Sequence, residues 1–273
     1  MDVLLKPYLL VACLALGALP ALAVKKSHEA KHTQTPAAVK AAPQNPDGAA
    51  EARLIQIYTL IGKAQNRQAL TMATRLVEEL PHFQLAQLVY GDLLTAQTRP
   101  LKTMGDVPET MARNGAEVLA DLREESQRRI KALRERPPAG TVPSQFLALS
   151  QRSRHAIAVD ASRSRLYLFE NSPSGLKLVA DYYISVGKAG ISKVTEGDQR
   201  TPLGVYYITS NLDPKSLKDF YGAGALPINY PNILDMRRGK TGSGIWLHGT
   251  PPNQFSRPPQ ASDGCVVLTN PDL

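Results

Sequence analysis

The residues best suited to chemistry lie near the end of the chain: His248 and Cys265, seventeen positions apart. Gly249 follows the histidine and Gly264 precedes the cysteine. A thiol attacks an acyl carbon only as the thiolate, and an imidazole within hydrogen-bond reach can take its proton. Because glycine has no Cβ, backbone N–H groups at 264 and 265 can approach the oxyanion that such an attack creates. The pattern is typical of a Cys-His acyl-transfer site.

Each residue of this pair also has a purely structural interpretation. A single cysteine is most often a small buried side chain, and a histidine after Ile-Trp-Leu can cap a strand. If residues 1–23 are removed as a signal peptide, Cys265 is the only cysteine left. It is then a buried thiol, an intermolecular bridge or a nucleophile. Together, the Gly-Cys and His-Gly-Thr motifs favour the nucleophile. With one sulfur, few histidines and no Cys-x-x-Cys, we expect no metal site.

The chain is basic, with a net charge of +8 over 273 residues. A positive protein favours anionic partners such as nucleic acid, anionic lipid or a cell-wall polymer. No run of Lys and Arg interleaved with aromatic residues is present, and no nucleic-acid motif is visible, so we expect no nucleic-acid partner. A solvated basic surface is the simplest interpretation of the charge.

Residues 1–23 have the pattern of a secretory signal peptide. Lys6 supplies a basic start, residues 8–19 form an apolar run, and residues 21–23 read Ala-Leu-Ala, an A-x-A cleavage site. The run is short for a membrane span. Residues 10–13 faintly resemble a lipoprotein processing site, and an uncleaved anchor is a further alternative. Export predicts a location in the periplasm or cell envelope.

The next part of the chain changes from a tether to helices. Residues 24–50 are rich in Ala, Lys and Pro and predict a disordered tether. Residues 51–136 form the predicted helical domain: three helices between 54 and 94, and one long polar helix over 107–136. The spacing of Ala69, Ala73 and Pro81 resembles part of a tetratricopeptide unit, and a small helical bundle explains it equally well.

Residues 137–151 read as a linker, and a strand pattern follows it from 152 to 273. Five β-prone runs stand between Gly and Pro turns: 155–159, 165–169, 176–186, 204–208 and 245–247. Residues 213–220 are expected to form a short helix, and the rest of 210–244 to roof a substrate groove. The predicted fold is therefore α+β and multidomain: a helical segment followed by a mostly β catalytic domain.

The two terminal motifs resemble the signature of the L,D-transpeptidase catalytic domain, the YkuD-like domain. The matching residues are His248-Gly249-Thr250 and Ser262-Asp263-Gly264-Cys265-Val266-Val267-Leu268. The Thr-Pro-x-Gly turn within residues 197–204 and the strands between 155 and 186 also fit the family pattern. The resemblance covers roughly residues 152–273. It implies a mostly β domain that exchanges peptide bonds in peptidoglycan stem peptides, with no metal or organic cofactor.

The resemblance also implies roles for individual residues. Carried over by position, Cys265 is the nucleophile and His248 is its base. The carbonyl of Gly249 orients the imidazole, and the N–H groups of Gly264 and Cys265 form the oxyanion hole. Ser262 supports the loop. The candidates for substrate binding are Ser262, Asp263, Thr250, Arg200 and Trp246. Acylation of the cysteine by carbapenems is a corollary.

The chain departs from the family pattern at three places. Asp263 stands where the family often has His, and Val267 stands where it usually has Arg or Asn. An Arg there could meet a substrate carboxylate, so other cations become candidates for that role: Arg200, Arg237, Arg238 and Lys240. Family domains generally continue with a helix and a last strand beyond the position of Leu273, which predicts a shortened domain.

Three functions are compatible with these observations. The first is L,D-transpeptidation, in which an amine from a neighbouring stem peptide or from a lipoprotein lysine resolves a thioester. The second uses water at the same site, as an L,D-carboxypeptidase or an amidase that releases wall-linked protein. The third is a non-catalytic cell-wall-binding scaffold whose helical segment binds a protein partner. The choice between the first two depends on groove shape and water exclusion, which sequence does not reveal.

Overall fold

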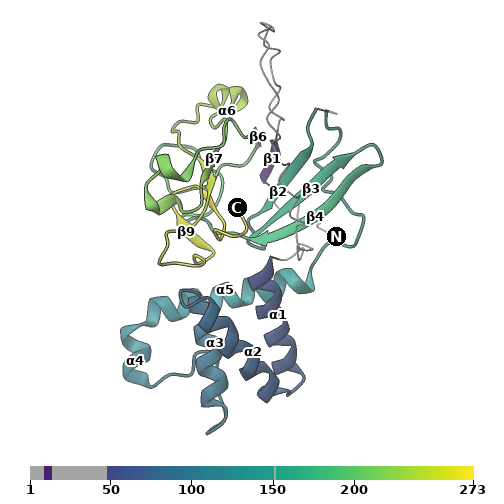
Figure 1. The fold of residues 1–273 in the computed structure, drawn as a ribbon. Helices are drawn as coiled ribbons and strands as arrows, with labels where there is room; N and C mark the ends of the chain where they lie inside the picture. Colours follow the sequence, from purple (N-terminus) through teal and green to yellow (C-terminus); the bar gives the residue numbers. More distant parts are fainter. Residues whose placement is uncertain (1–8, 14–47, 151) are drawn as a thin grey trace, which may run out of the picture.

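The computed structural model describes residues 9–13, 48–150 and 152–273, and Figure 1 shows a helical half below a β half. The helices lie in the N-terminal part and the strands mostly in the C-terminal part, so the coarse fold class predicted from the sequence is confirmed. Within the described ranges, no helix combines the length and apolar character needed to cross a bilayer.

Three helices form the core of the helical half: α1 (Ala49–Gly62), α2 (Asn66–Glu79) and α3 (Gln84–Thr95). Their apolar faces meet around Leu54, Leu76 and other fully buried side chains. Helix α1 begins inside the stretch predicted as a tether, while residues 24–47 lie outside the described part. The tetratricopeptide-like character stays a prediction.

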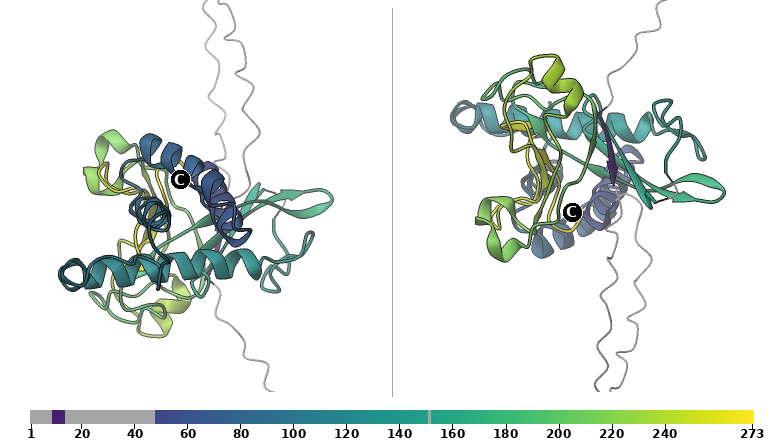
Figure 2. Two further views of the ribbon diagram at one scale, coloured as in Figure 1. Left: turned by 90° about the horizontal axis from the view of Figure 1, so that it is seen from below. Right: turned by 90° about the horizontal axis from the view of Figure 1, so that it is seen from above.

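The expected single helix over 107–136 is wrong in one respect, because it is split in two. Helix α4 (Glu109–Asn114) ends at Gly115, whose backbone (φ −113°, ψ 22°) is not helical. Helix α5 (Ala116–Arg134) then runs across the top of the other helices and faces the β half (Figures 1 and 2). Glycine costs about 1 kcal/mol in a helix interior, which favours a break at this position.

The first sheet of the β half has the strand order β4-β3-β2-β1-β6, in which β1 is Leu9–Cys13. Strands β2 (His155–Asp160), β3 (Arg165–Ser172) and β4 (Gly175–Tyr183) form an antiparallel meander. The predicted hairpin between the first two is present, and Asp160 accepts hydrogen bonds from the N–H groups of the turn that joins them. Strand β6 (Val205–Tyr207) stands at the far edge.

The remaining strands form two short sheets that carry the functional motifs. Strand β8 (Trp246–His248) lies between β10 (Val266–Val267), which is parallel to it, and β7 (Ala225–Pro227), which is antiparallel. Strand β5 (Val186–Gly187) pairs with β9 (Gln260–Ser262). The run predicted as one strand over 176–186 is thus divided between two sheets.

The long connection over 210–244 contains more structure than the expected single short helix. Residues 213–220 form two 3₁₀ turns, Pro214–Ser216 and Asp219–Tyr221, instead of one helix. Helix α6 (Ile233–Arg237) follows β7, and the side chains of Asn232 and Asp235 cap its N-terminus reciprocally. The second 3₁₀ turn brings Phe220 and Tyr221 beside His248.

Strand β1 (Leu9–Cys13) is placed inside the first sheet, although the sequence predicts these residues to be part of a signal peptide. Its residues pair antiparallel with β2 from Leu9↔Val159 to Cys13↔His155, and parallel with β6 from Leu10↔Val205 to Ala12↔Tyr207. The other residues of the predicted signal peptide lie outside the described part, and its cleavage stays a prediction. Cleavage would remove β1, so a processed protein must hold β2 and β6 in another way.

A chain that begins at Val24 is therefore expected to be less stable than the full chain. Removing a strand bonded on both sides takes away the ladder hydrogen bonds of β2 and β6 and turns both strands into edges, at about 0.5–1.5 kcal/mol for each hydrogen bond lost. The midpoint of thermal unfolding should fall by roughly 10 °C or more. Circular dichroism on the two purified forms tests this, and equal midpoints would show that the fold does not need β1.

Buried charges join the two halves. The guanidinium of Arg129 on α5 pairs with Glu125 at 2.6 Å and with Glu51 of α1. The second oxygen of Glu51 pairs with Arg165 of β3 at 2.9 Å. The Arg129 guanidinium also lies 3.7 Å from the ring centre of Tyr183 in β4. All five side chains are almost fully buried, so this network ties α1 and α5 to the first sheet.

Candidate active site

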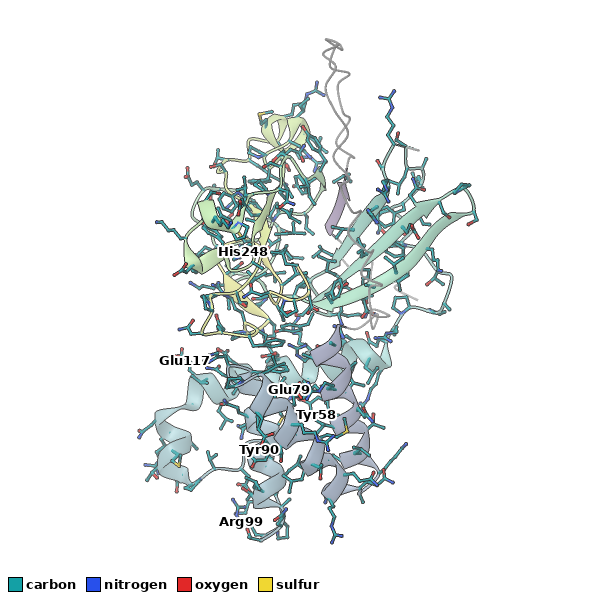
Figure 3. The ribbon with its side chains drawn as sticks, in the orientation of Figure 1. Tyr58, Glu79, Tyr90, Arg99, Glu117 and His248 are labelled. Atoms are coloured by element: carbon teal, nitrogen blue, oxygen red, sulfur yellow. The ribbon has the colours of Figure 1, made fainter. Side chains whose placement is uncertain are left out.

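The parallel pairing of β8 and β10 brings the two halves of the sequence motif together. Val266 pairs with Leu247 and Val267 with His248, so Cys265 enters its strand opposite Trp246. Side chains on one face of a sheet alternate along each strand. The thiol and the imidazole therefore project from the same face, one diagonal step apart. Figure 3 shows His248 within the β half, well above the labelled residues of the helices.

His248 is held in the form that a general base needs. Its side chain is 1% exposed, and its Nδ1 lies 2.7 Å from the carbonyl oxygen of Gly249. A carbonyl can only accept, so Nδ1 carries the proton and Nε2 keeps its lone pair. Burial lowers the pKa of the imidazole to about 4, against a smaller opposing effect of this hydrogen bond. The ring is therefore neutral near pH 7.

Aromatic rings surround the imidazole on the side of the 3₁₀ turn. The ring centres of Tyr221 and Phe220 lie 5.1 Å and 5.7 Å from that of His248. The ring of Tyr221 also packs on Trp246, at 4.8 Å. These contacts account for the burial of the histidine. No spacing in the sequence connects residues 220–221 with 248, so their role is visible only in the structure.

Cys265 is a free thiol of intermediate exposure. Its Sγ lies 3.5 Å from the carbonyl oxygen of Gly244, to which it donates. Among the described contacts, no hydrogen bond joins the Cys265 thiol to His248. Catalytic hydrogen bonds are often long or misaligned before substrate binds. Burial raises the pKa of the thiol, and a hydrogen bond from the backbone of Trp246 and, to a smaller extent, the nearby charge of Arg257 lower it in part.

The loop before the cysteine differs from the predicted oxyanion hole. The N–H of Gly264 donates to Ser262 Oγ at 3.1 Å, so it is already engaged. The Ser262 hydroxyl in turn donates to the carbonyl of Cys265 at 2.6 Å, which is the loop support that the family resemblance implies. Of the two predicted donors, only the N–H of Cys265 is left for an oxyanion. Gly264 has φ 129°, and a Cβ there would lie 2.8 Å from the carbonyl oxygen of Arg200.

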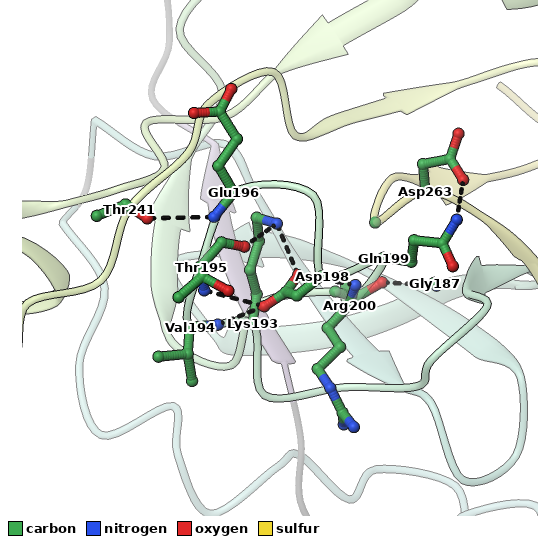
Figure 4. A network of polar contacts seen from close by, with 12 residues as sticks. Gly187, Lys193, Val194, Thr195, Glu196, Asp198, Gln199, Arg200, Thr241 and Asp263 are labelled. Carbon is green, nitrogen blue, oxygen red and sulfur yellow. Dashed lines mark hydrogen bonds and ion pairs between the residues drawn. The ribbon is translucent and has the colours of Figure 1, made fainter.

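Asp263 and Arg200 both make polar contacts with exposed parts of the neighbouring loops. The Asp263 side chain is 73% exposed, and it pairs with Lys188 at 3.0 Å and accepts from Gln199 at 3.2 Å. The side chain of Arg200 is exposed and donates to the carbonyl of Ile191 at 3.0 Å. Figure 4 shows these two side chains on opposite sides of the loop. The expectation that Arg200 contacts substrate stays a prediction.

The loop that contains Arg200 is held by Asp198. This carboxylate accepts from the buried ammonium of Lys193 at 2.8 Å and from the N–H groups of Val194, Thr195 and Arg200 (Figure 4). These hydrogen bonds outweigh the effect of burial and lower the pKa of Asp198. The network gives the predicted Thr-Pro-x-Gly region a fixed shape beside Asp263.

Thr250 is held by hydrogen bonds to Asn270 and Phe255. Its N–H donates to Asn270 Oδ1 at 3.0 Å, its carbonyl accepts from Asn270 Nδ2 at 2.8 Å, and its hydroxyl donates to the carbonyl of Phe255 at 3.3 Å. The same Asn270 oxygen accepts from the N–H of Ala223 at 2.9 Å. Asn270 therefore ties the turn after His248 to the segment after the 3₁₀ turn. No motif in the sequence singles out this residue.

The part of the chain that the structure describes contains no set of side chains placed to bind a metal ion. No group of three or more His, Cys, Asp or Glu side chains is placed to hold an ion there. The arrangement instead offers a thiol, a neutral imidazole and a backbone N–H on one face of a small sheet. These are the parts that an acyl transfer through a thioester requires.

The pH dependence of any reaction at Cys265 should reflect the burial of His248. Protonation removes the base, so activity should fall as the pH decreases through about 4, and not through the ordinary value of 6.5. Iodoacetamide labelling of Cys265 should be half-maximal above pH 9.0, because burial raises the pKa of the thiol. Profiles of kcat/KM and of labelling rate against pH test both expectations. An acid limb centred at pH 6.5 would contradict the first.

Comparisons with known proteins agree with this geometry. A family model described as the L,D-transpeptidase catalytic domain, YkuD, matches residues 154–273. Comparison with curated protein sequences found no significant match.

Solved structures with similar segments include proteins from two bacteria. The helical cell shape determining protein Pgp2 from Campylobacter jejuni is 32% identical, with a TM-score of 0.35, over 39% of this chain and 37% of that one. Bd1075 from Bdellovibrio bacteriovorus is 37% identical, with a TM-score of 0.36, over 43% of this chain and 41% of its own. This chain thus spans about two fifths of the length of each.

The site lies entirely within the matched segment. His248 ends β8, Cys265 directly precedes the adjacent strand β10, and the carbonyl of Gly249 orients the imidazole. Residues 154–273 of this protein are therefore an L,D-transpeptidase catalytic domain of the YkuD family.

Proposed function

We propose that this protein is a cysteine-dependent L,D-transpeptidase that acts on peptidoglycan in the cell envelope. The observation that carries the proposal is the tautomer of His248, whose Nδ1 is committed to the Gly249 carbonyl at 2.7 Å and whose Nε2 is left to take a proton. A histidine that only capped a strand would not need this fixed tautomer beside a free thiol. The catalytic family implies peptidoglycan as the substrate class.

The reaction has two steps with the same residues. Nε2 of His248 takes the proton of Cys265, and the thiolate attacks the carbonyl at the L-centre of a stem tetrapeptide. The C–S bond forms, the C–N bond to the terminal D-residue breaks, and the imidazolium returns the proton to the departing amine. An acceptor amine then attacks the thioester. A new amide forms, and the thiol is regenerated.

Hydrolysis at the same site is the second candidate. Cys265 has intermediate exposure, and the loop around it bears the exposed Asp263 and Arg200, so water can approach from this side. With water as acceptor, the same thioester gives an L,D-carboxypeptidase. The two activities differ only in the second step, so a single product analysis distinguishes them.

The test is incubation of the purified protein with tetrapeptide muropeptides, followed by mass spectrometry. Crosslinked dimers support transpeptidation, and tripeptide monomers support hydrolysis. The matched control is the Cys265→Ala protein, which keeps the fold but has no nucleophile. A product pattern that is the same with and without Cys265 would leave the non-catalytic scaffold as the remaining function.

Localisation in the envelope belongs to the same proposal. The apolar run over residues 8–19 and the Ala-Leu-Ala sequence support export, and peptidoglycan lies outside the inner membrane. The mass of the mature protein recovered from the envelope fraction tests processing. A mass that corresponds to a chain starting at Val24 means that β1 is absent from the working enzyme, and the full mass means that it is retained.

A further inference from the structure

Arg257 stands out among the buried cations of the described residues. Four Lys or Arg side chains are less than 9% exposed: Arg129, Arg165, Lys193 and Arg257. The first three each pair with a carboxylate, on Glu125, Glu51 and Asp198. Arg257 is 8% exposed, its Nε is buried without an acceptor, and its terminal nitrogens have no hydrogen-bond acceptor among the described residues.

A buried arginine without an acceptor lowers the stability of the folded protein. Burying a charged group without a partner costs several kcal/mol, and proteins ordinarily pair such groups or neutralise them. Arginine stays protonated near pH 7 even when burial lowers its pKa, as it does here. The guanidinium thus offers a planar set of unused donors, whose geometry matches a carboxylate.

The position of Arg257 relates it to the reacting groups. Its guanidinium carbon lies 4.4 Å from the ring centre of Phe220, whose ring centre is 5.7 Å from that of His248. Its charge is close enough to lower the pKa values of both His248 and Cys265. A carboxylate bound to Arg257 would therefore lie on the aromatic side of the imidazole, beside the site of acyl transfer.

The loop that carries Arg257 is held from both halves of the molecule. The ring of Phe255 packs on Phe83 with 4.5 Å between centres, and the hydroxyl of Ser256 donates to Glu125 at 3.0 Å. The carbonyl of Arg257 accepts from the hydroxyl of Tyr183 at 2.8 Å. These contacts position the backbone before any ligand arrives, which lowers the entropy cost of binding. The helical half therefore helps to hold the loop that carries this arginine.

The cations proposed from sequence are less suited to binding a carboxylate at this site. Arg200 donates to the carbonyl of Ile191, Arg237 and Arg238 are exposed, and Lys240 pairs with Asp235 at 2.7 Å. We propose that Arg257 binds the terminal carboxylate of the donor stem peptide and so supplies the recognition that Val267 cannot. This inference rests on the proposed function, because it assumes that a peptide is bound beside Cys265.

The test compares two peptides that differ only at the carboxyl terminus. A stem tetrapeptide with a free carboxylate and its C-terminal amide are titrated into the full chain carrying Cys265→Ser, which cannot form the thioester. Calorimetry should show that the free acid binds about 10- to 100-fold more tightly, the range of a charge-assisted hydrogen bond. Adding Arg257→Gln should remove this preference. Arg154→Gln, an exposed arginine at the start of β2, is the matched control and should leave it unchanged.

One further variant and two control measurements separate binding from folding. Arg257→Lys keeps the charge but not the planar fork, so a partial preference for the acid is expected. Thermal unfolding and iodoacetamide labelling in the Cys265 background show whether each Arg257 variant retains its fold and its site. If Arg257→Gln is folded and still prefers the acid, or if the parent does not distinguish the two peptides, the assignment is wrong. Failure of the proposed function would appear separately, as the absence of Cys265-dependent products.

Discussion

Replacing Cys265 with alanine should reduce product formation from muropeptides by about 10⁴-fold or more, which is the scale seen when an enzyme loses its nucleophile. The reason is that no other thiol lies on the β8–β10 face, so no other group can form the thioester. Intact-protein mass spectrometry gives a second measurement, since the wild-type chain should gain the mass of the acyl group and the variant should not. Turnover by the alanine protein at the wild-type rate would contradict a mechanism through Cys265.

A variant at His248 separates the contribution of the thiol from the contribution of the base that activates it. His248→Gln keeps the thiol and a polar side chain of similar size but removes the proton acceptor. We expect product formation to fall by about 10²- to 10⁴-fold, the usual contribution of a general base. Labelling by iodoacetamide at high pH should persist in this variant, because the reagent needs only the thiolate. Loss of that labelling would indicate a collapsed site.

Replacing Arg129 with methionine should destabilise the protein by about 3–5 kcal/mol, because it leaves buried carboxylates without their partner. Glu125 is paired with Arg129 at 2.6 Å, and Glu51 contacts the same guanidinium from α1. The midpoint of thermal unfolding should fall by roughly 10 °C or more. Arg113→Met is the control: it breaks an exposed i,i+4 pair with Glu109, and its effect should stay below about 0.5 kcal/mol.

The origin of this effect can be tested directly. If the penalty comes from unpaired carboxylates, changing Glu51 and Glu125 to glutamine in the Arg129→Met background should recover part of the stability. Because Ser256 donates to Glu125, the same variants should also loosen the loop that carries Arg257. Equal unfolding midpoints for wild type and Arg129→Met would mean that this network contributes nothing to the stability.

Local sequence patterns are sufficient to predict an element when the element depends only on its own segment of the chain. Periodicity and turn residues predict the helical stripe of Leu54 and Ile57, the hairpin around Asp160 and the strand that ends at His248, and all three are present. The split at Gly115 does not follow from these patterns, since glycine is tolerated inside many helices and only packing decides where the chain turns.

The apolar N-terminus shows what local sequence patterns do not determine. Residues 8–19 satisfy the rules for a signal peptide, and a short apolar run of this kind also suits a buried strand. The structure uses Leu9–Cys13 between β2 and β6, strands that lie more than 140 residues further along the chain. The position between β2 and β6 is a property of the assembled sheet, and a short segment of sequence does not reveal it.

The sequence determined the types of the candidate site residues and their family: a thiol after glycine, and an imidazole before Gly-Thr, within residues 154–273. Tertiary structure alone decided their surroundings. Phe220 and Tyr221 bury the histidine, Ser262 takes the N–H of Gly264, and Arg257 lies unpaired beside them. Burial, pKa and hydrogen-bond capacity depend on which distant segments pack together, and local spacing carries no information about that packing.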